Sequence, residues 1–168
     1  MAEVSDQYRI AIVTASDQGA AGRREDLSGP AIAEALAGLG LIILSTIVAD
    51  EIDVISATLR DLADIQGADL ILTTGGTGLS PRDVTPEATL AVADRLVPGI
   101  PEAMRAASLA LTNRAMLSRA VAVIRGRTLI INLPGSPKAV RECLTVIRPV
   151  LPHALAILTG RDGECART

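Results

Sequence analysis

Short apolar segments rich in β-branched residues alternate along this chain with segments that carry helix signals. The apolar segments cover residues 9–14, 41–48, 69–74, 121–124 and 129–133, and most of them are apolar at nearly every position. Continuous apolar segments of this length are typical of strands buried on both faces of a parallel sheet. The pattern therefore predicts an α/β fold with a mostly parallel central sheet flanked by helices on both faces.

Prolines, glycines and capping residues mark the ends of the intervening helices. Helices are expected from Ser28-Gly29-Pro30 to the glycines at 38 and 40, across residues 51–66, from Thr85-Pro86 through residue 96, across residues 98–111, and from Ser136-Pro137 through residue 151. Taken alone, Asp50 is expected to cap the second of these helices.

The organisation of the chain indicates one domain. The 168 residues contain no internal repeat, linker or low-complexity tract, so a single domain over residues 1–168 is expected, with a polar, frayed tail from about residue 160. No uninterrupted apolar stretch approaches 18 residues, and the first residues lack the pattern of a signal peptide. We therefore expect no membrane span and a cytoplasmic location.

The composition argues against several classes of function. The chain has no Trp or Phe, a single Tyr and a net charge of -3. Proteins that bind single-stranded nucleic acid stack bases on aromatic side chains and present basic surfaces, so nucleic acid is not an expected partner. Cys143, Cys165 and the single histidine, His153, are too few for a disulfide framework or a structural zinc site. We assign no function to Cys143 or His153.

Unusual residues follow the ends of the predicted strands. Asp17 follows the first strand and Asp50 the second, while residues 75–83 follow the third and residues 134–138 follow the last. Ligands of parallel sheets bind outside the carboxyl ends of the strands. We therefore expect these four loops to meet at one edge of the sheet and to form the site.

Two of these loops place glycines directly after a buried strand. The first glycine loop, residues 75–83, contains GGTG followed by Arg82-Asp83, and the second glycine loop, residues 134–138, reads PGSPK. Glycines let backbone N–H groups approach an anion, and a following helix N-terminus adds positive potential. Neither loop matches a Walker or dinucleotide-binding motif, and each alone is compatible with an ordinary turn. Together they indicate a ligand with more than one phosphate.

Carboxylates at the same edge indicate a metal ion. Asp17, Asp50 and Asp83 lie in three of the loops, and Mg²⁺ is often bound by one or two carboxylates together with substrate phosphates. A charged segment with Arg23 and Arg24 is either a solvated loop or a segment that closes over a bound anion. The residues alone thus predict a phosphate-binding, magnesium-dependent edge.

Together, these motifs resemble the molybdopterin adenylyltransferases of molybdenum cofactor biosynthesis, of the Mog type. The matching stretches run from residue 16 to about residue 143 and read SDQGAAGRREDLSGP, VADE, TTGGTGLSPRDVTPEAT, PGIPEAMR, LSRAV and NLPGSPKAVREC. The resemblance implies a molybdopterin-binding domain, usually a homotrimer, that joins AMP from ATP to the terminal phosphate of molybdopterin and releases pyrophosphate, with Mg²⁺. A molybdenum insertase would use the product.

The resemblance also implies roles for individual residues. Asp50 and Asp83 would be the essential acidic pair, which we interpret as magnesium ligands because a phosphate monoester is largely deprotonated at pH 7 and needs no general base. Glu102 and Arg105 are weaker candidates. The residues expected to bind the nucleotide and molybdopterin are Asp17, Gly75, Gly76, Thr77, Gly78, Gly135, Ser136, Pro137 and Lys138.

One position departs from the family pattern. Gln18 stands where the family usually has Arg after Ser-Asp, so one positive charge is missing, and Arg23 or Arg24 is a candidate replacement. Three alternatives to the transferase stay open: a non-catalytic molybdopterin carrier, a scaffold protein, and a nucleotide hydrolase on the same fold.

Overall fold

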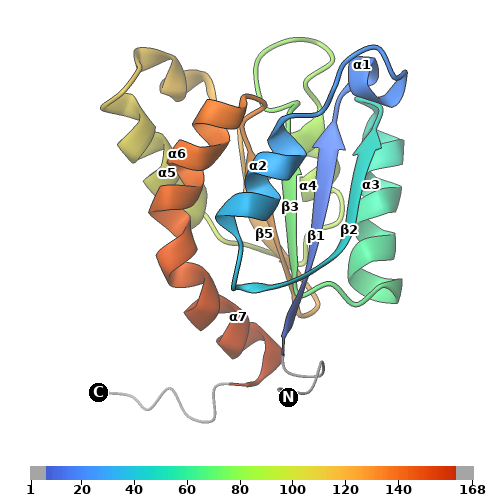
Figure 1. Ribbon diagram of the computed structural model, residues 1–168, viewed down its shortest axis with the longest axis vertical. Helices are drawn as coiled ribbons and strands as arrows, with labels where there is room; N and C mark the ends of the chain where they lie inside the picture. Colours follow the sequence, from blue (N-terminus) through green and yellow to red (C-terminus); the bar gives the residue numbers. More distant parts are fainter. Residues whose placement is uncertain (1–6, 162–168) are drawn as a thin grey trace.

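The computed structural model describes residues 7–161, which form a six-stranded sheet between two layers of helices (Figure 1). The strands are β1 (Tyr8–Ala15), β2 (Gly40–Val48), β3 (Leu70–Thr74), β4 (Arg95–Leu96), β5 (Ala122–Arg125) and β6 (Thr128–Leu133). Their order is β2-β1-β3-β6-β5-β4, and the first four of these pair in parallel while β5 and β4 are added antiparallel. The expected mostly parallel sheet is confirmed. The part of the predicted frayed tail that follows residue 161 lies outside the described residues.

Helices cover both faces of the sheet, as expected. They are α1 (Asp17–Ala20), α2 (Ser28–Ala35), α3 (Ile52–Arg60), α4 (Thr85–Leu90), α5 (Gly99–Leu109), α6 (Pro137–Ile147) and α7 (Leu151–Thr159), with a π-helical turn at Asp61–Ile65 and 3₁₀ turns at Asn113–Leu117 and Arg148–Val150. Helices α2, α5, α6 and α7 pack on one face, and α3 and α4 pack on the other (Figure 1).

Successive residues of β1 alternate between two cores. Ile10 and Ile12 pack under α2, α6 and α7, whereas Ala11 and Val13 pack under α3 and α4. All four side chains are fully buried. Because both faces are covered, the strand is apolar at every one of these positions.

The edge strand β2 is less buried than its sequence predicts. Leu41, Leu44 and Ile47 are each more than one-third exposed, at 45%, 41% and 37%. Strand β2 pairs only with β1 and lies at the end of the sheet order. The expectation of burial on both faces is therefore wrong for this strand.

The helix expected from Thr85 through residue 96 is shorter than predicted. It ends at Leu90, and Arg95–Leu96 forms β4 beside β5. The Asp94 N–H donates to Ile124 O at 2.9 Å and the Val97 N–H to Ala122 O at 2.8 Å, so pairing with β5 satisfies this backbone in place of a helix.

The helical stretch Pro137–Thr159 is long and apolar enough to cross a membrane, judged by length and composition alone, with a mean hydropathy of 1.3. The 3₁₀ turn around Pro149 interrupts it, and α7 follows, which the sequence did not predict. Val140, Leu144, Leu151 and Leu155 of this stretch are buried in the core against the sheet. A core helix passes the same test, so the stretch is weak support for a membrane span.

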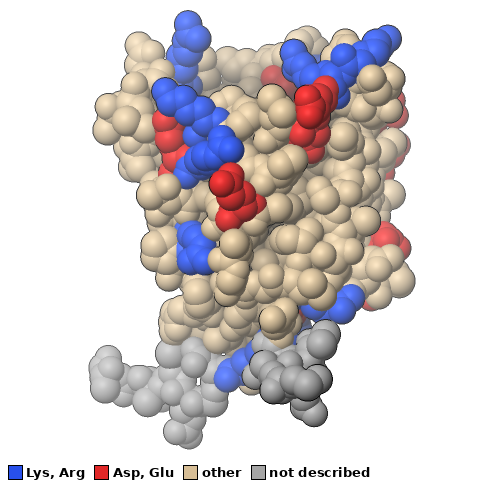
Figure 2. Space-filling model, in the orientation of Figure 1, with Lys and Arg blue, Asp and Glu red and all other residues tan. Residues whose placement is uncertain are grey.

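Charged side chains gather in two places on the face shown in Figure 2. One is the surface over α2 and α6, where Arg141 forms an ion pair with Glu34 at 3.4 Å. The other is the end of the molecule that carries α1, where the parallel strands have their carboxyl ends.

Candidate functional site

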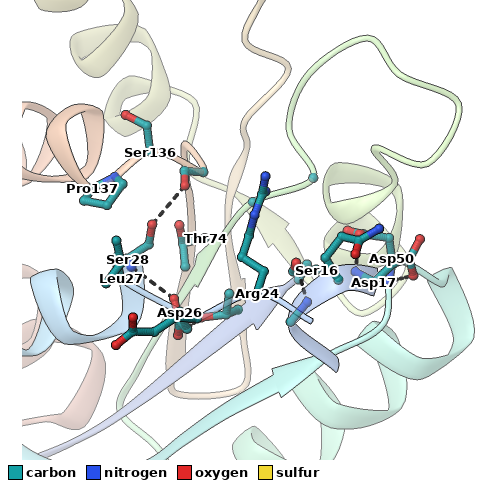
Figure 3. A pocket seen from close by; sticks show the side chains of 18 of the residues that line it. Ser16, Asp17, Arg24, Asp26, Leu27, Ser28, Asp50, Thr74, Ser136 and Pro137 are labelled. Carbon is teal, nitrogen blue, oxygen red and sulfur yellow. Dashed lines mark hydrogen bonds between the residues drawn. The ribbon is translucent and has the colours of Figure 1, made fainter. Parts of the chain in front are cut away.

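A pocket of about 650 Å³ opens at the carboxyl ends of the parallel strands (Figure 3). Its lining consists of residues 14–19, 24–28, 50, 74–76, 83 and 135–137. The four loops that the sequence placed at one edge therefore meet around one cavity. The predicted site residues in its lining are Asp17, Asp50, Gly75, Gly76, Asp83, Gly135, Ser136 and Pro137.

Three predicted site residues lie outside this lining. Thr77 and Gly78 line a smaller cavity of about 270 Å³ together with residues of α5 and α6. The Lys138 side chain is 88% exposed, and its ammonium lies 3.9 Å from the Glu142 carboxylate.

Asp17 and Asp50 hold the loops after β1 and β2 together. The Asp17 N–H donates to Asp50 Oδ2 at 2.8 Å, and the Asp50 N–H donates to Asp17 Oδ1 at 2.9 Å (Figure 3). The expected role of Asp50 as a helix cap is wrong, because Glu51 precedes α3 and no side chain caps that helix. Instead, Asp50 satisfies an amide of the neighbouring loop.

Arg82 of the first glycine loop reaches across the pocket rim to Asp17. Its Nε and Nη2 atoms donate to the two Asp17 carboxylate oxygens, both at 2.9 Å. This paired contact, together with the Asp50 N–H, lowers the pKa of Asp17. Burial raises the pKa of Asp50, and the nearby charges of Asp17 and Asp83 raise it further. Asp50 is therefore a carboxylate whose negative charge a bound cation would stabilise.

Arg119 stabilises the first glycine loop through hydrogen bonds to its backbone. Its Nε donates to Gly78 O at 2.7 Å, its Nη2 to Asp83 O, and its Nη1 to the Glu87 carboxylate, whose pKa it lowers. The Asp83 carboxylate in turn accepts from the Ser80 N–H at 2.9 Å. Arg119 lies in the LSRAV stretch, but no pattern along the chain singled it out. The signal that could have pointed to it is its position as a charged residue shortly before a predicted apolar strand.

Gly75 and Gly76 of the first glycine loop lie too close to other atoms to carry a side chain. A Cβ on Gly75, where φ is +90°, would lie 2.4 Å from Ala15 O, and one on Gly76, where φ is +67°, would lie 2.2 Å from Thr85 Oγ1. A Cβ on Gly135 would lie 3.4 Å from Gly75 Cα, an ordinary van der Waals distance, so the two loops are neighbours but a side chain at Gly135 would not clash. The crowding at Gly75 and Gly76 is the close approach that the glycines predicted.

The Thr85 hydroxyl does not cap α4, contrary to its predicted role. Its Oγ1 is fully buried and has no hydrogen-bond partner among the residues described. The Thr85 backbone is nonetheless held, because its N–H donates to Gly76 O at 3.1 Å and its carbonyl accepts from Thr89 Oγ1 at 2.8 Å.

Hydroxyl groups hold the second glycine loop. Ser28 Oγ donates to Gly135 O at 2.9 Å, and Thr74 Oγ1 donates to Pro134 O at 2.7 Å. Ser136 caps α6 as predicted, since its Oγ accepts from the Ala139 N–H at 3.1 Å.

Asp26 caps α2 and fixes the loop that precedes this helix. Its Oδ1 accepts from the Ser28 and Gly29 N–H groups, both at 3.0 Å, and its Oδ2 accepts from Thr14 Oγ1 at 2.8 Å. Part of the charged segment around Arg23 and Arg24 is thus anchored to β1 and is not a free loop.

The remaining candidates lie away from the main pocket. Arg105 donates to Ala120 O at 2.9 Å and lines the smaller cavity, and Glu102 is exposed on α5. Cys143 is buried in the core at 6% exposure, and burial raises the pKa of its thiol. His153 lies exposed on α7.

The carboxylates of the pocket fit a metal ion only in part. Over residues 7–161, no group of three His, Cys, Asp or Glu side chains is arranged to hold a metal. Asp50 and Asp83 nevertheless line the same pocket, and within the described chain Asp50 Oδ1 accepts no hydrogen bond. This donor set fits Mg²⁺ bound by two carboxylates and completed by substrate phosphates.

This chain is similar to proteins of molybdopterin biosynthesis. Residues 11–153 match the family described as "Probable molybdopterin binding domain". The molybdopterin adenylyltransferase of Helicobacter pylori (strain J99) is 46% identical over 154 residues, which cover 90% of this chain and 88% of that protein. The molybdopterin adenylyltransferase of Escherichia coli K12 is 45% identical over 173 residues, which cover 94% and 89%. The crystal structure of the molybdopterin biosynthesis enzyme MoaB from Thermus thermophilus superposes with a TM-score of 0.86 at 54% identity, covering 91% of this chain and 97% of that chain.

Proposed function

This chain belongs to the molybdopterin adenylyltransferase family of molybdenum cofactor biosynthesis, a family of nucleotidyltransferases, and we propose that its pocket transfers AMP from ATP to the terminal phosphate of molybdopterin. One observation carries the assignment of the site. Two acidic residues, Asp50 and Asp83, and both glycine loops line a single cavity at the carboxyl ends of the parallel strands. A volume of about 650 Å³ lies within the range of small-molecule sites.

The glycine loops supply the binding surface for the phosphates. Gly75 and Gly76 adopt positive φ, and Ser136, which caps α6, lines the same pocket. Backbone N–H groups in such turns, and at a helix N-terminus, bind anions. Because the hydrogen bond from Thr74 Oγ1 to Pro134 O links the starts of the two loops, a ligand that spans both would have its phosphate groups held in a fixed relation.

The transfer itself needs placement and charge neutralisation more than proton transfer. The terminal phosphate of molybdopterin is largely deprotonated at pH 7, since the second pKa of a phosphate monoester is about 6. One of its oxygens would attack the α-phosphorus of ATP, forming a new P–O bond while the bond to pyrophosphate breaks. Asp50 and Asp83 therefore have no proton to remove in this step.

Asp50 and Asp83 would hold Mg²⁺ together with the substrate phosphates. When bound, the ion neutralises charge on the transferred group and on the departing pyrophosphate. The contribution of this chain is to keep two carboxylates in place, through the Asp17 N–H on Asp50 and the Ser80 N–H on Asp83.

The family resemblance also supports a homotrimer, a cytoplasmic location and delivery of the product to a molybdenum insertase. Exposed apolar side chains on the surface formed by α5 and the segment after it are a candidate contact between subunits: Leu109, Leu111, Met116 and Leu117. Sedimentation equilibrium would test the trimer directly.

The decisive experiment is to mix the purified protein with ATP, Mg²⁺ and molybdopterin and to search for adenylylated pterin by mass spectrometry. We expect product only when all three are present. Molybdopterin binding without product, in protein shown to be folded, would favour the carrier function instead. ATP cleavage without molybdopterin would favour a nucleotide hydrolase.

A further inference from the structure

The charged side chains that line the pocket are acidic, with one exception. Within the described part of the chain, Arg24 is the only Lys or Arg in its lining. The acidic residues of the lining are Asp17, Glu25, Asp26, Asp50 and Asp83. A ligand that carries several phosphates would meet net negative charge there, which opposes binding unless cations offset it.

Arg23 and Arg24 are neighbours in sequence but have different surroundings. Arg23 Nε donates to Gln18 Oε1 at 3.2 Å, and Arg23 does not line the pocket. Arg24 lines the pocket and forms no hydrogen bond or ion pair with any residue the structure describes. In Figure 3 its side chain stands between the Asp26–Ser28 end and the Asp17–Asp50 end of the cavity.

The fold fixes the backbone on either side of Arg24. The Arg23 N–H donates to Gln18 O at 2.9 Å, and the Asp26 carboxylate is held by Thr14 and by the first turn of α2. The backbone that carries Arg24 is thus anchored at the pocket, while the N–H donors of its guanidinium stay available. Such a group presents paired N–H donors that match two phosphate oxygens.

We propose that Arg24 binds a phosphate group of the substrate and supplies the positive charge that Gln18 does not provide at the lining position beside it. This inference rests on the proposed function. The phosphate belongs either to the polyphosphate of ATP or to the terminal phosphate of molybdopterin, and both present the same oxyanion to the guanidinium.

The test compares Arg24→Gln with the matched control Arg23→Gln, which removes the same charge one residue away. Binding of Mg²⁺-ATP, inorganic pyrophosphate and molybdopterin is measured by isothermal titration calorimetry. Loss of a charge-assisted hydrogen bond predicts about ten-fold weaker binding for Arg24→Gln, and the loss should shrink as salt is added. Arg23→Gln should change affinity by about two-fold at most, as expected for an exposed group.

The ligands separate the two sources of phosphate. Weaker binding of ATP and pyrophosphate assigns Arg24 to the nucleotide, whereas weaker binding of molybdopterin alone assigns it to the pterin phosphate, and either result supports the proposal. Equal effects of the two variants, or unchanged binding of every ligand, would overturn it while the proposed function stands. A wild-type protein that binds neither ATP nor molybdopterin would overturn the proposed function itself.

A second variant tests whether an arginine at position 18 can replace the positive charge of Arg24. Gln18 lines the pocket, so an arginine there would face the same cavity. Adding Gln18→Arg to Arg24→Gln should restore most of the lost affinity. If the affinity stays at the level of Arg24→Gln alone, Arg24 does not supply the positive charge that Gln18 lacks.

Discussion

The two glycine loops of the pocket are held by different kinds of interaction. The first glycine loop is braced by guanidinium groups: Arg119 binds two of its carbonyls, and Arg82 ties it to Asp17. The second glycine loop is tied by the neutral hydroxyls of Ser28 and Thr74. Hydrogen bonds from charged donors are roughly twice as strong as neutral ones. The loop with the candidate metal ligand is thus the more firmly braced of the two.

The largest expected effect is that of Asp83→Asn in the first glycine loop. The amide oxygen of Asn can still accept from the Ser80 N–H, so the turn should persist while the negative charge is lost. Loss of a residue that only hydrogen-bonds a metal ligand can lower metal affinity or activity by about 10–100-fold. Removal of a direct ligand should therefore slow AMP transfer by about 100-fold or more. The rate is measured with all substrates present, with molybdopterin affinity and thermal unfolding as controls. Turnover like that of the wild type would exclude Asp83 as a metal ligand.

The brace itself can be tested with Arg119→Lys. Lysine keeps the charge but cannot reach Gly78 O, Asp83 O and Glu87 together, so the free energy of unfolding should fall by roughly 1–3 kcal/mol. AMP transfer should fall as well, since the loop carrying Asp83 loosens. Chemical denaturation and the transfer rate measure the two effects.

Arg125→Lys is the matched control for that variant. Arg125 makes a similar set of contacts away from the pocket, with the Asp64 carboxylate and Val92 O. The Arg125→Lys variant should have a lower free energy of unfolding than the wild type but the same rate of AMP transfer. If both lysine variants lose activity to the same extent, Arg119 does not act through the first glycine loop.

Ser28→Ala tests the weaker attachment of the second glycine loop. Removing the hydrogen bond to Gly135 O should cost about 1 kcal/mol of unfolding free energy. Ser56→Ala is a control on the other face of the sheet, where Ser56 Oγ donates to Ala88 O at 3.1 Å. Only Ser28→Ala should also weaken ligand binding; a loss of binding in both variants would point to general destabilisation.

The smallest expected effect has the opposite sign. Thr85→Val replaces a buried hydroxyl without a partner by a methyl group of similar size, so the protein should become more stable by up to about 1 kcal/mol. Thr89→Val should destabilise it, because Thr89 Oγ1 both donates to Thr85 O and accepts from Asn132 Nδ2 at 2.9 Å. Thermal unfolding separates the two. Destabilisation by Thr85→Val would show that its hydroxyl has a partner, such as a buried water.

The parallel part of the fold could be predicted because its strands are covered on both faces and are therefore apolar throughout. The antiparallel edge could not be predicted in the same way. Strand β4 has two residues, Arg95 and Leu96, both exposed, and it exists because β5 offers backbone partners to a segment that local signals make helical. Local propensity is a weak prior wherever tertiary pairing competes with it.

The meeting of the four loops at one edge of the sheet was predictable, but the hydrogen bonds between their side chains were not. The rule that ligands bind at strand carboxyl ends brought Asp17, Asp50 and Asp83 to one edge. The bonds that hold them join residues far apart in sequence, such as Asp17 with Arg82 and Arg119 with Gly78. Hydrophobic periodicity describes which face of an element is buried, and it contains no information on which polar side chains meet across loops.

Asp17 and Asp50 exchange hydrogen bonds with each other's backbone, yet their pKa values are shifted in opposite directions. As the pH falls from neutrality, Asp50, whose pKa burial raises, is protonated before Asp17, whose pKa the Arg82 contact lowers. The first protonation removes an unfavourable buried charge and so does not weaken the fold. The second, below the ordinary carboxyl pKa of 3.8, removes a contribution that favoured the folded state. In terms of the proposed function, acid would remove the charge of Asp50, a proposed metal ligand, before it removes the contribution of Asp17 to stability.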